Sequence, residues 1–385
     1  MSNKLKFPKL ELIQPLLGSD PEFFLRKKGK IIESTKVIPL SGMSYNQWSY
    51  NRVVCDGVQA ELHTGPQICR EVYSHRIAEV LNYTKNKLND INVTIDFSGV
   101  IKLSDKELRN LSKYSKKFGC APSKNVYFKD DKIKVDASKY PYRSAGGHIH
   151  LSFEEDSCIE SLRENPVLVV KLLDIICGNT LVMVDRDPMQ IERRKVYGKA
   201  GEYRMPKHGI EYRVPSNFWL GSYPLFGLTM GLARQAVLVA NAMIEFETNY
   251  DKLHPYRVIF DLVNEADIIE AINTNNFDLA KSNFDKIKDV LLKMVPREDG
   301  ASSFLPITKS NIKEFEYFVN RINKYGLSYW FSNDKLFNWI KCYNSGRWVG
   351  WETFSRTEVR KDMKKSAFNS KCTFSSVMNK LLLSD

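Results

Sequence analysis

Residues 146–153, Gly-Gly-His-Ile-His-Leu-Ser-Phe, alternate strictly between polar and apolar side chains. This period of two predicts a β-strand with Ile149 and its apolar neighbours facing a core. The opposite face carries His148, His150 and Ser152, which include two of the six histidines of the chain. The preceding glycines leave room for a ligand or a crossing strand. The face therefore suits a metal or phosphates, although two half-exposed strand histidines would show the same pattern.

Composition and charge indicate a globular protein with an anionic partner. The 385 residues are 43% hydrophobic, which is enough for one large or two medium domains. A net charge of +12 favours nucleotides, nucleic acid or acidic substrates, and does not by itself establish nucleic-acid binding. The seven cysteines include no CxxC pair, so neither a disulfide framework nor a zinc ribbon is indicated.

The compartment expected from these features is the cytoplasm. Scattered single cysteines are typical of a reducing environment, and the first residues carry no apolar signal-peptide core. Residues 222–245 are the one stretch apolar enough to suggest a membrane span. Arg234 lies at its centre, and a central arginine costs about 2.5–3.5 kcal/mol on insertion scales. We therefore expect a buried core helix and no membrane partner.

Hydrophobic periodicity divides the chain into strands and helices. The predicted strands are 17–26, 53–64 with an irregularity at Gly57, 91–101, 146–153 and 210–214. The predicted helices are 70–89, 165–184 and 222–248, and then 262–295 and 310–325 after the character changes near residue 250. Residues 104–140 are predicted to form a polar surface excursion, and a basic tail runs from residue 356 to 371.

Four of the predicted strands carry charged or histidine side chains two residues apart. They are Asp20/Glu22, Gln59/Glu61 with Asp56 just upstream, His148/His150 and Glu211/Arg213. If these strands are neighbours, their polar faces form one surface whose crowded carboxylates need a cation to neutralise them. Oxygen ligands with an occasional imidazole suit Mg²⁺ or Mn²⁺, and the lack of cysteine argues against a structural zinc. Each pair taken alone would more often be a solvated strand face.

A second segment, residues 192–206, is dense in arginine, lysine and glycine. Arginine binds phosphate through a planar fork of donors, and Gly198 and Gly201 let the backbone approach an anion. Beside a metal surface this composition predicts a polyphosphate clamp, whereas in isolation it would suit a solvated basic loop. The chain has no Walker A sequence and no GxGxxG, which disfavours a P-loop or Rossmann site.

In these motifs the chain resembles the glutamine synthetase fold and its carboxylate–amine ligase relatives, which include glutamate–cysteine ligases. It resembles in particular the phage-encoded COOH·NH2 ligases (amidoligases) of type 2. The motifs, in the family's order, are residues 18–25, 59–61, 148–152, 203–206 and 210–215. The departure is Asp20, which stands where glutamine synthetases have glutamate.

The resemblance covers roughly residues 15–250 and implies an α+β fold. That fold is a mainly antiparallel curved sheet with helices on its outer face, followed by a mostly helical C-terminal region. We accordingly expect a ligase domain over residues 1–250 and a helical region with a basic tail over residues 251–385.

The resemblance also implies ATP and two or more Mg²⁺ or Mn²⁺ ions. One ion would be held by Glu22 and Glu61, with Asp56 as a less certain ligand, and the other by Asp20, His148 and Glu211. Contacts to ATP would come from His150, Arg194, Lys199 and Arg204. Arg213 would bind the substrate carboxylate or the transferred phosphoryl group, and Glu211 and Asp56 would share in catalysis. Asp56, Glu61 and Glu192 are all candidates for the base.

The implied reaction is ATP-dependent amide formation through an acyl phosphate that an amine attacks, with Arg213 or a metal stabilising the oxyanion. Two other interpretations remain open. A metal-dependent nuclease or phosphohydrolase would use the same surface, and a non-catalytic nucleic-acid-binding or virion protein on the same fold would suit the basic tail. The partners expected are a carboxylate and an amine, small or polymeric, with the positive charge favouring an anionic substrate. A homo-oligomer is left open.

Overall fold

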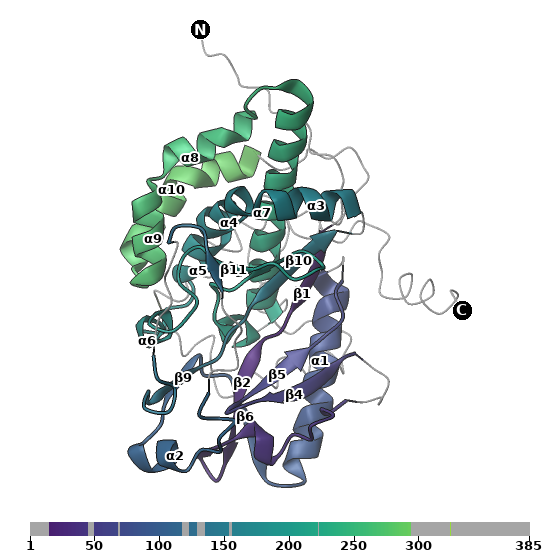
Figure 1. Ribbon diagram of the computed structural model, residues 1–385, viewed down its shortest axis with the longest axis vertical. Coiled ribbons are helices and arrows are strands. Elements are labelled where there is room, and N and C mark those ends of the chain that lie inside the picture. Colours follow the sequence, from purple (N-terminus) through teal and green to yellow (C-terminus); the bar gives the residue numbers. More distant parts are fainter. Residues whose placement is uncertain are drawn as a thin grey trace, which may run out of the picture.

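The computed structural model describes residues 15–44, 50–67, 70–117, 123–128, 135–153, 156–221, 223–293 and residue 324. Over these ranges it is an α+β protein with curled antiparallel sheets, and the predicted fold class is confirmed. Figure 1 shows strands β2, β4, β5 and β6 at one end and helices α8, α9 and α10 at the other.

The first sheet has five antiparallel strands in the order β1-β10-β12-β11-β8. Their bounds are β1 Pro15–Ser19, β10 Ile149–Phe153, β12 Ile210–Tyr212, β11 Glu202–Arg204 and β8 Lys124–Asn125. The register pairs Gly18 with His150, His150 with Glu211, and Glu211 with Arg204. Residues in register share a face, so these side chains form one row across the sheet. Ile149, Leu151 and Phe153 point to the other face and are buried, as their alternation predicts.

The second sheet runs β3-β2-β5-β4, with β6 also paired to β2. Its strands are β3 Lys30–Ile32, β2 Glu22–Lys27, β5 Gln59–His63, β4 Arg52–Asp56 and β6 Val93–Asp96. A small third sheet pairs β7 Val100–Lys102 with β9 Tyr142–Ser144. In the second sheet Glu22 lies opposite Glu61, while Ala60 and Leu62 on the alternate face are fully buried.

Three predicted single strands are each two strands, so those predictions were wrong. The segment 91–101 is β6, which pairs with β2, and β7, which pairs with β9. The segment 17–26 breaks at Asp20 and Pro21, because β1 pairs in the first sheet and β2 in the second. Proline has no backbone N–H for a ladder, and the next N–H, of Glu22, donates to Gly146 in another part of the chain at 2.8 Å. The segment 53–64 is a hairpin that turns at Gly57, whose φ is +64°.

The helices follow the predicted apolar stripes closely. Helix α1 spans Arg70–Asn89, as predicted, and the stripe residues Ile77, Leu81 and Leu88 are buried. The predicted helix 165–184 is α4 Pro166–Leu173, a π-helical turn Asp174–Gly178 and α5 Asn179–Val182. The remaining helices before residue 222 are α2 Asp105–Arg109, α3 Asp156–Glu164 and α6 Gln190–Arg194, with 3-10 turns at Ser34–Lys36 and Asn217–Gly221.

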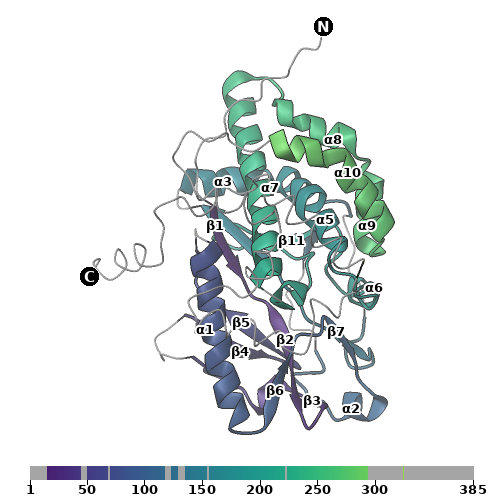
Figure 2. The same cartoon turned by 180° about the vertical axis from the view of Figure 1, so that it is seen from behind.

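Helix α7, Tyr223–Tyr250, lies beside α1 behind the sheets (Figure 2). By length and composition alone Leu225–Tyr250 could cross a membrane, but most of it is buried within the protein and Arg234 is 3% exposed. Such burial is that of a core helix, as the central arginine predicts.

The chain continues past residue 250 through a 3-10 turn at Pro255–Arg257 and helices α8 Val258–Leu262, α9 Glu265–Asn273 and α10 Phe277–Lys293. Ile268 and Ile272 of α9 and Phe284 of α10 belong to the same hydrophobic cluster as Leu17 of β1. These helices therefore pack onto the main core. The proposed division at residue 250 stays a prediction. The predicted helix 310–325, apart from residue 324, and the basic tail lie outside the described residues.

Candidate functional site

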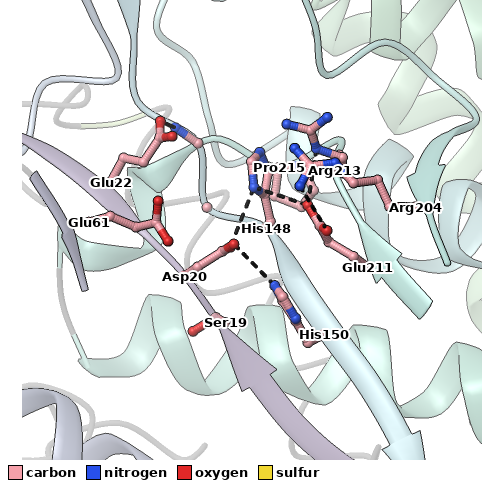
Figure 3. Close-up of polar contacts among 12 residues, drawn as sticks. Ser19, Asp20, Glu22, Glu61, His148, His150, Arg204, Glu211, Arg213 and Pro215 are labelled. Carbon is pink, nitrogen blue, oxygen red and sulfur yellow. Dashed lines mark hydrogen bonds and ion pairs between the residues drawn. The ribbon is translucent and has the colours of Figure 1, made fainter. Parts of the chain in front are cut away.

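Two groups of acidic and imidazole side chains meet where β1 leads into β2 (Figure 3). Glu22, Asp56 and Glu61, here called the acidic group, place ligand atoms within 4.8 Å of one another. Asp20, His150 and Glu211 do the same, and with His148 they are called the mixed group. The break at Asp20-Pro21 is what brings the groups together, since Asp20 occupies the junction between the two sheets. All the metal ligands predicted from sequence thus lie in one place.

The acidic group is built by the β2–β5–β4 sheet. Glu22 and Glu61 are opposite each other in the register, and Asp56 is the last residue of β4 before the hairpin turn. Glu22 is 3% exposed, and its Oε2 accepts a hydrogen bond of 2.6 Å from the backbone N–H of Gly146. On the outer side, His63 of β5 forms a hydrogen bond to the carboxylate of Glu61.

The mixed group is centred on Asp20. Its Oδ1 lies 3.4 Å from His148 Nδ1, and its Oδ2 lies 3.2 Å from His150 Nε2. His148 Nδ1 lies 3.5 Å from Glu211 Oε1. His150, which the resemblance assigns to ATP phosphates, therefore sits among the groups able to hold a metal.

Two arginines border the mixed group. Arg213 Nε lies 3.1 Å from Glu211 Oε1, and Arg204 Nη1 lies 3.4 Å from Glu211 Oε2. Arg213 is 1% exposed and also lies 3.8 Å from Glu202, whereas the Arg204 side chain is 28% exposed. Arg204 is therefore the arginine that can reach a solvent-borne anion, and Arg213 is packed against Glu211.

The pKa values of Glu22 in the acidic group and Asp20 in the mixed group are shifted in opposite directions. Burial, with the charges of Asp56 and Glu61, raises the pKa of Glu22 to about 8. Burial likewise raises the pKa of Asp56 and of Glu61. Burial alone would raise the pKa of Asp20, but the adjacent His150 and His148 hold it well below its ordinary value. Three crowded carboxylates thus repel one another in the acidic group, while His150 next to Asp20 and two arginines next to Glu211 balance charge in the mixed group.

The donor set fits divalent cations. Carboxylate oxygens with imidazole nitrogens are ligands of Mg²⁺ and Mn²⁺. Buried Asp20 Oδ1 and His148 Nε2 have no hydrogen-bond partner within the part of the chain that the structure describes. Burial and the adjacent Arg213 lower the pKa of His148 to about 4, which keeps its imidazole neutral and able to act as a ligand.

Arg194 and Lys199, two of the predicted ATP contacts, make contacts to other parts of the protein. Arg194 is buried behind β12, where its Nη1 donates to the carbonyl of Val214 at 2.6 Å. Lys199 lies in the loop before β11, and its backbone N–H donates to the Glu202 carboxylate at 3.1 Å. Their roles toward ATP stay predictions. The candidate base Glu192 is on α6, where its carboxylate contacts Lys195 at 2.7 Å and Tyr140 at 3.1 Å.

Sequence reasoning missed three residues of the site. His63 lies two residues after Glu61 on β5, and no role was assigned to it. His208 stacks on His150 with ring centroids 5.4 Å apart, and Tyr197 contacts Glu22 through its hydroxyl at 3.2 Å. The last two come from irregular segments, which carry no periodic signal. Four of the six histidines of the chain therefore lie at this site.

Residues 121–294 match the family model described as Phage phiEco32-like COOH·NH2 ligase-type 2. Over this segment the chain is similar to that ligase family. The match is less than half of the chain and agrees with the family that the motifs resemble. The name of the family indicates a carboxylate–amine ligase. A search of curated proteins finds no match to the chain.

Residues 121–294 and the residues before them each contribute part of the site. His148, His150, Arg204, Glu211 and Arg213 lie within the matched residues. The residues that precede this segment supply the rest of the two groups, namely Asp20, Glu22, Asp56 and Glu61. The structure places both contributions around one junction, so the site extends beyond the matched part of the chain.

Proposed function

We propose that this protein is an ATP- and Mg²⁺-dependent carboxylate–amine ligase that forms an amide through an acyl phosphate. One observation carries the proposal: the acidic group and the mixed group adjoin each other, with Arg204 at their edge, in a chain whose residues 121–294 are similar to a ligase family. The acidic group would hold one cation and the mixed group another. When bound, such ions neutralise the phosphate charges of the nucleotide.

In this proposal each cationic side chain has a separate task. Arg204 is partly exposed beside Glu211, so it can contact a phosphate of ATP or the transferring phosphoryl group. Arg213 is buried against Glu211, so it holds that carboxylate in place and adds fixed positive charge where an oxyanion would form. Buried donors of this kind need no reorganisation during the reaction.

The two chemical steps balance as follows. The substrate carboxylate takes the γ-phosphoryl group, which releases ADP and gives an acyl phosphate. The amine nitrogen then attacks the acyl carbon, the C–O bond to phosphate breaks, and the amine loses a proton. Among the three candidate bases we favour Asp56 for that proton, since it is partly exposed in the acidic group while Glu61 is engaged by His63. Glu192 is engaged by Lys195 on another surface.

Calorimetry with a nonhydrolysable ATP analogue, with and without Mg²⁺, tests the proposal. We expect binding that requires Mg²⁺ in the wild type and is lost in Glu211→Ala, with thermal melting to confirm folding. Incubation with ATP and a metabolite extract should then yield ADP, phosphate and a ligated product detectable by intact mass. Nucleotide-independent nicking of a plasmid in Mn²⁺, with no metal-dependent nucleotide binding, would instead identify a nuclease.

A further inference from the structure

Tyr197 lies between the two groups of the site. It follows α6 in the loop that leads to β11, and it is 8% exposed. Its hydroxyl oxygen lies 3.2 Å from Glu22 Oε2 and 3.1 Å from the carbonyl oxygen of Ser144. Both are acceptors, so the single phenolic proton is shared between them. One end of Tyr197 is therefore anchored in the acidic group.

The ring of Tyr197 faces the mixed group. It meets the His148 imidazole edge to face, with centroids 5.9 Å apart and an angle of 69° between the planes. The guanidinium of Arg213 lies 5.5 Å from the ring centroid, within the range of a cation–π contact. The same side chain thus touches a ligand of each group and the arginine that holds Glu211.

Neighbouring residues fix the position of this ring. The guanidinium of Arg193 lies 4.8 Å from the ring centroid and donates to the carbonyls of Arg213, Val214 and Pro215 at 2.7–3.0 Å. Gly198 has φ +79°, and a Cβ there would collide with the Arg193 guanidinium. The strand end that carries Arg213 and the loop that carries Tyr197 are therefore held together by one buried arginine.

The hydroxyl also orients Glu22. Both described donors to this carboxylate, the Tyr197 hydroxyl and the Gly146 N–H at 2.6 Å, fall on Oε2. With Oε2 engaged, Oε1 is the oxygen that can serve a cation together with Asp56 and Glu61. A carboxylate with two fixed donors on one oxygen cannot rotate without losing both hydrogen bonds.

We propose that Tyr197 is a positioning residue that orients Glu22 in the acidic group and holds it at a set distance from His148 and Arg213. This inference rests on the proposed function, because it needs both groups to bind metal.

Titration of the full chain with Mn²⁺ alone, followed by calorimetry and by the electron paramagnetic resonance signal of free Mn²⁺, tests this inference without substrate. We expect the wild type to bind two Mn²⁺ ions. Tyr197→Phe keeps the ring and removes the hydroxyl. It should weaken the binding of one Mn²⁺ ion about tenfold, leave the binding of the other unchanged and leave the melting temperature unchanged. Tyr256→Phe, a buried tyrosine of the 3-10 turn at Pro255–Arg257, is the control and should match the wild type.

A double-mutant cycle assigns the weakened ion. Glu22→Gln alone should lower the affinity for the same Mn²⁺ ion. Adding Tyr197→Phe should lower that affinity no further, since the hydroxyl acts through Glu22. Additive losses, unchanged binding of both ions in Tyr197→Phe, or equal weakening of both ions with a lower melting temperature would each overturn the role of Tyr197 and leave the ligase proposal standing. A wild type that binds no Mn²⁺ would overturn both.

Discussion

The acidic group and the mixed group lie on either side of Asp20-Pro21 and balance their charges differently. In the acidic group, three carboxylates crowd together, and burial raises the pKa of Glu22 to about 8. In the mixed group, Glu211 has Arg213 and Arg204 within 3.4 Å. The acidic group is therefore the one whose carboxylate repulsion a bound cation would relieve, while the mixed group is held together by the protein's own charges. The comparison predicts that losing a mixed-group residue costs stability, and that losing an acidic-group residue costs cation binding.

The largest effect is expected from Glu211→Ala. It removes the nearest carboxylate from buried Arg213 and leaves Glu202 at 3.8 Å, so the loss in free energy of unfolding should be large but should not exceed the about 3–5 kcal/mol of a fully unpaired buried charge. Urea unfolding measures this loss, and ADP release in the presence of amine should fall below detection. Glu265→Ala, which breaks an exposed ion pair with Lys171, is the control and should cost less than about 1 kcal/mol. A Glu211→Ala protein with wild-type stability and activity would contradict the site.

Glu22→Gln should have the opposite profile. The amide keeps the size of the side chain and relieves repulsion with Asp56 and Glu61. The free energy of unfolding of the metal-free variant should therefore lie within about 1 kcal/mol of the wild-type value. The rise in melting temperature on adding Mn²⁺ should shrink, because one oxygen ligand has lost its charge. Thermal melts with and without Mn²⁺ measure both quantities. Equal losses in free energy of unfolding in Glu22→Gln and Glu211→Ala would contradict the difference between the two groups.

Asp174 gives a pH-dependent test of the packing beneath the mixed group. It accepts a hydrogen bond of 2.6 Å from Tyr212, the neighbour of Glu211 on β12, and burial raises its pKa to about 7. Because the pKa of Asp174 is higher in the folded protein, the carboxyl loses its proton at lower pH in the unfolded chain. The stability that protonated Asp174 contributes is therefore fully present below about pH 4 and is lost as the pH rises through 7. Asp174→Asn should therefore gain roughly 2–4 kcal/mol over the wild type at pH 8 and much less at pH 5. Urea unfolding at both values measures it, with the exposed Asp251→Asn as control.

The smallest effect is expected from Glu192→Ala. Glu192 lies on α6, its carboxylate contacts Lys195 and Tyr140, and it belongs to neither group. Amine-dependent ADP release should change less than about twofold, since surface ion pairs contribute little. A large drop in rate with unchanged nucleotide binding would return Glu192 to the candidate bases and remove Asp56 from that role.

The local parts of this fold were predictable because their signals are local. Helix α1 begins and ends where its apolar stripe predicts, and the alternation of residues 146–153 predicts which side chains of β10 face the core. A β-strand has a side-chain period of two whatever it pairs with, so His148 and His150 are assigned to one face by sequence alone. Sequence reasoning also singled out every carboxylate and imidazole of the two groups, although the resemblance assigned His150 to ATP.

The parts that depend on distant partners were not predictable. Arg194 and Arg204 look equivalent as basic residues of one segment, yet Arg194 donates to Val214 behind β12 while Arg204 lies beside Glu211. Tyr197 and His208 reach the site from irregular segments, where direction depends on the packing of the whole chain. Periodicity carries no information about such contacts.

The sequence by itself determined the residue types of the site, their strand faces and the family that their motifs resemble. Only the tertiary structure decided that Asp20-Pro21 separates two sheets, that Gly57 closes a hairpin, and that the three carboxylates of the acidic group face one another. The physical reason is that strand pairing is long-range: which strands meet, and in which register, depends on burial summed over the whole core.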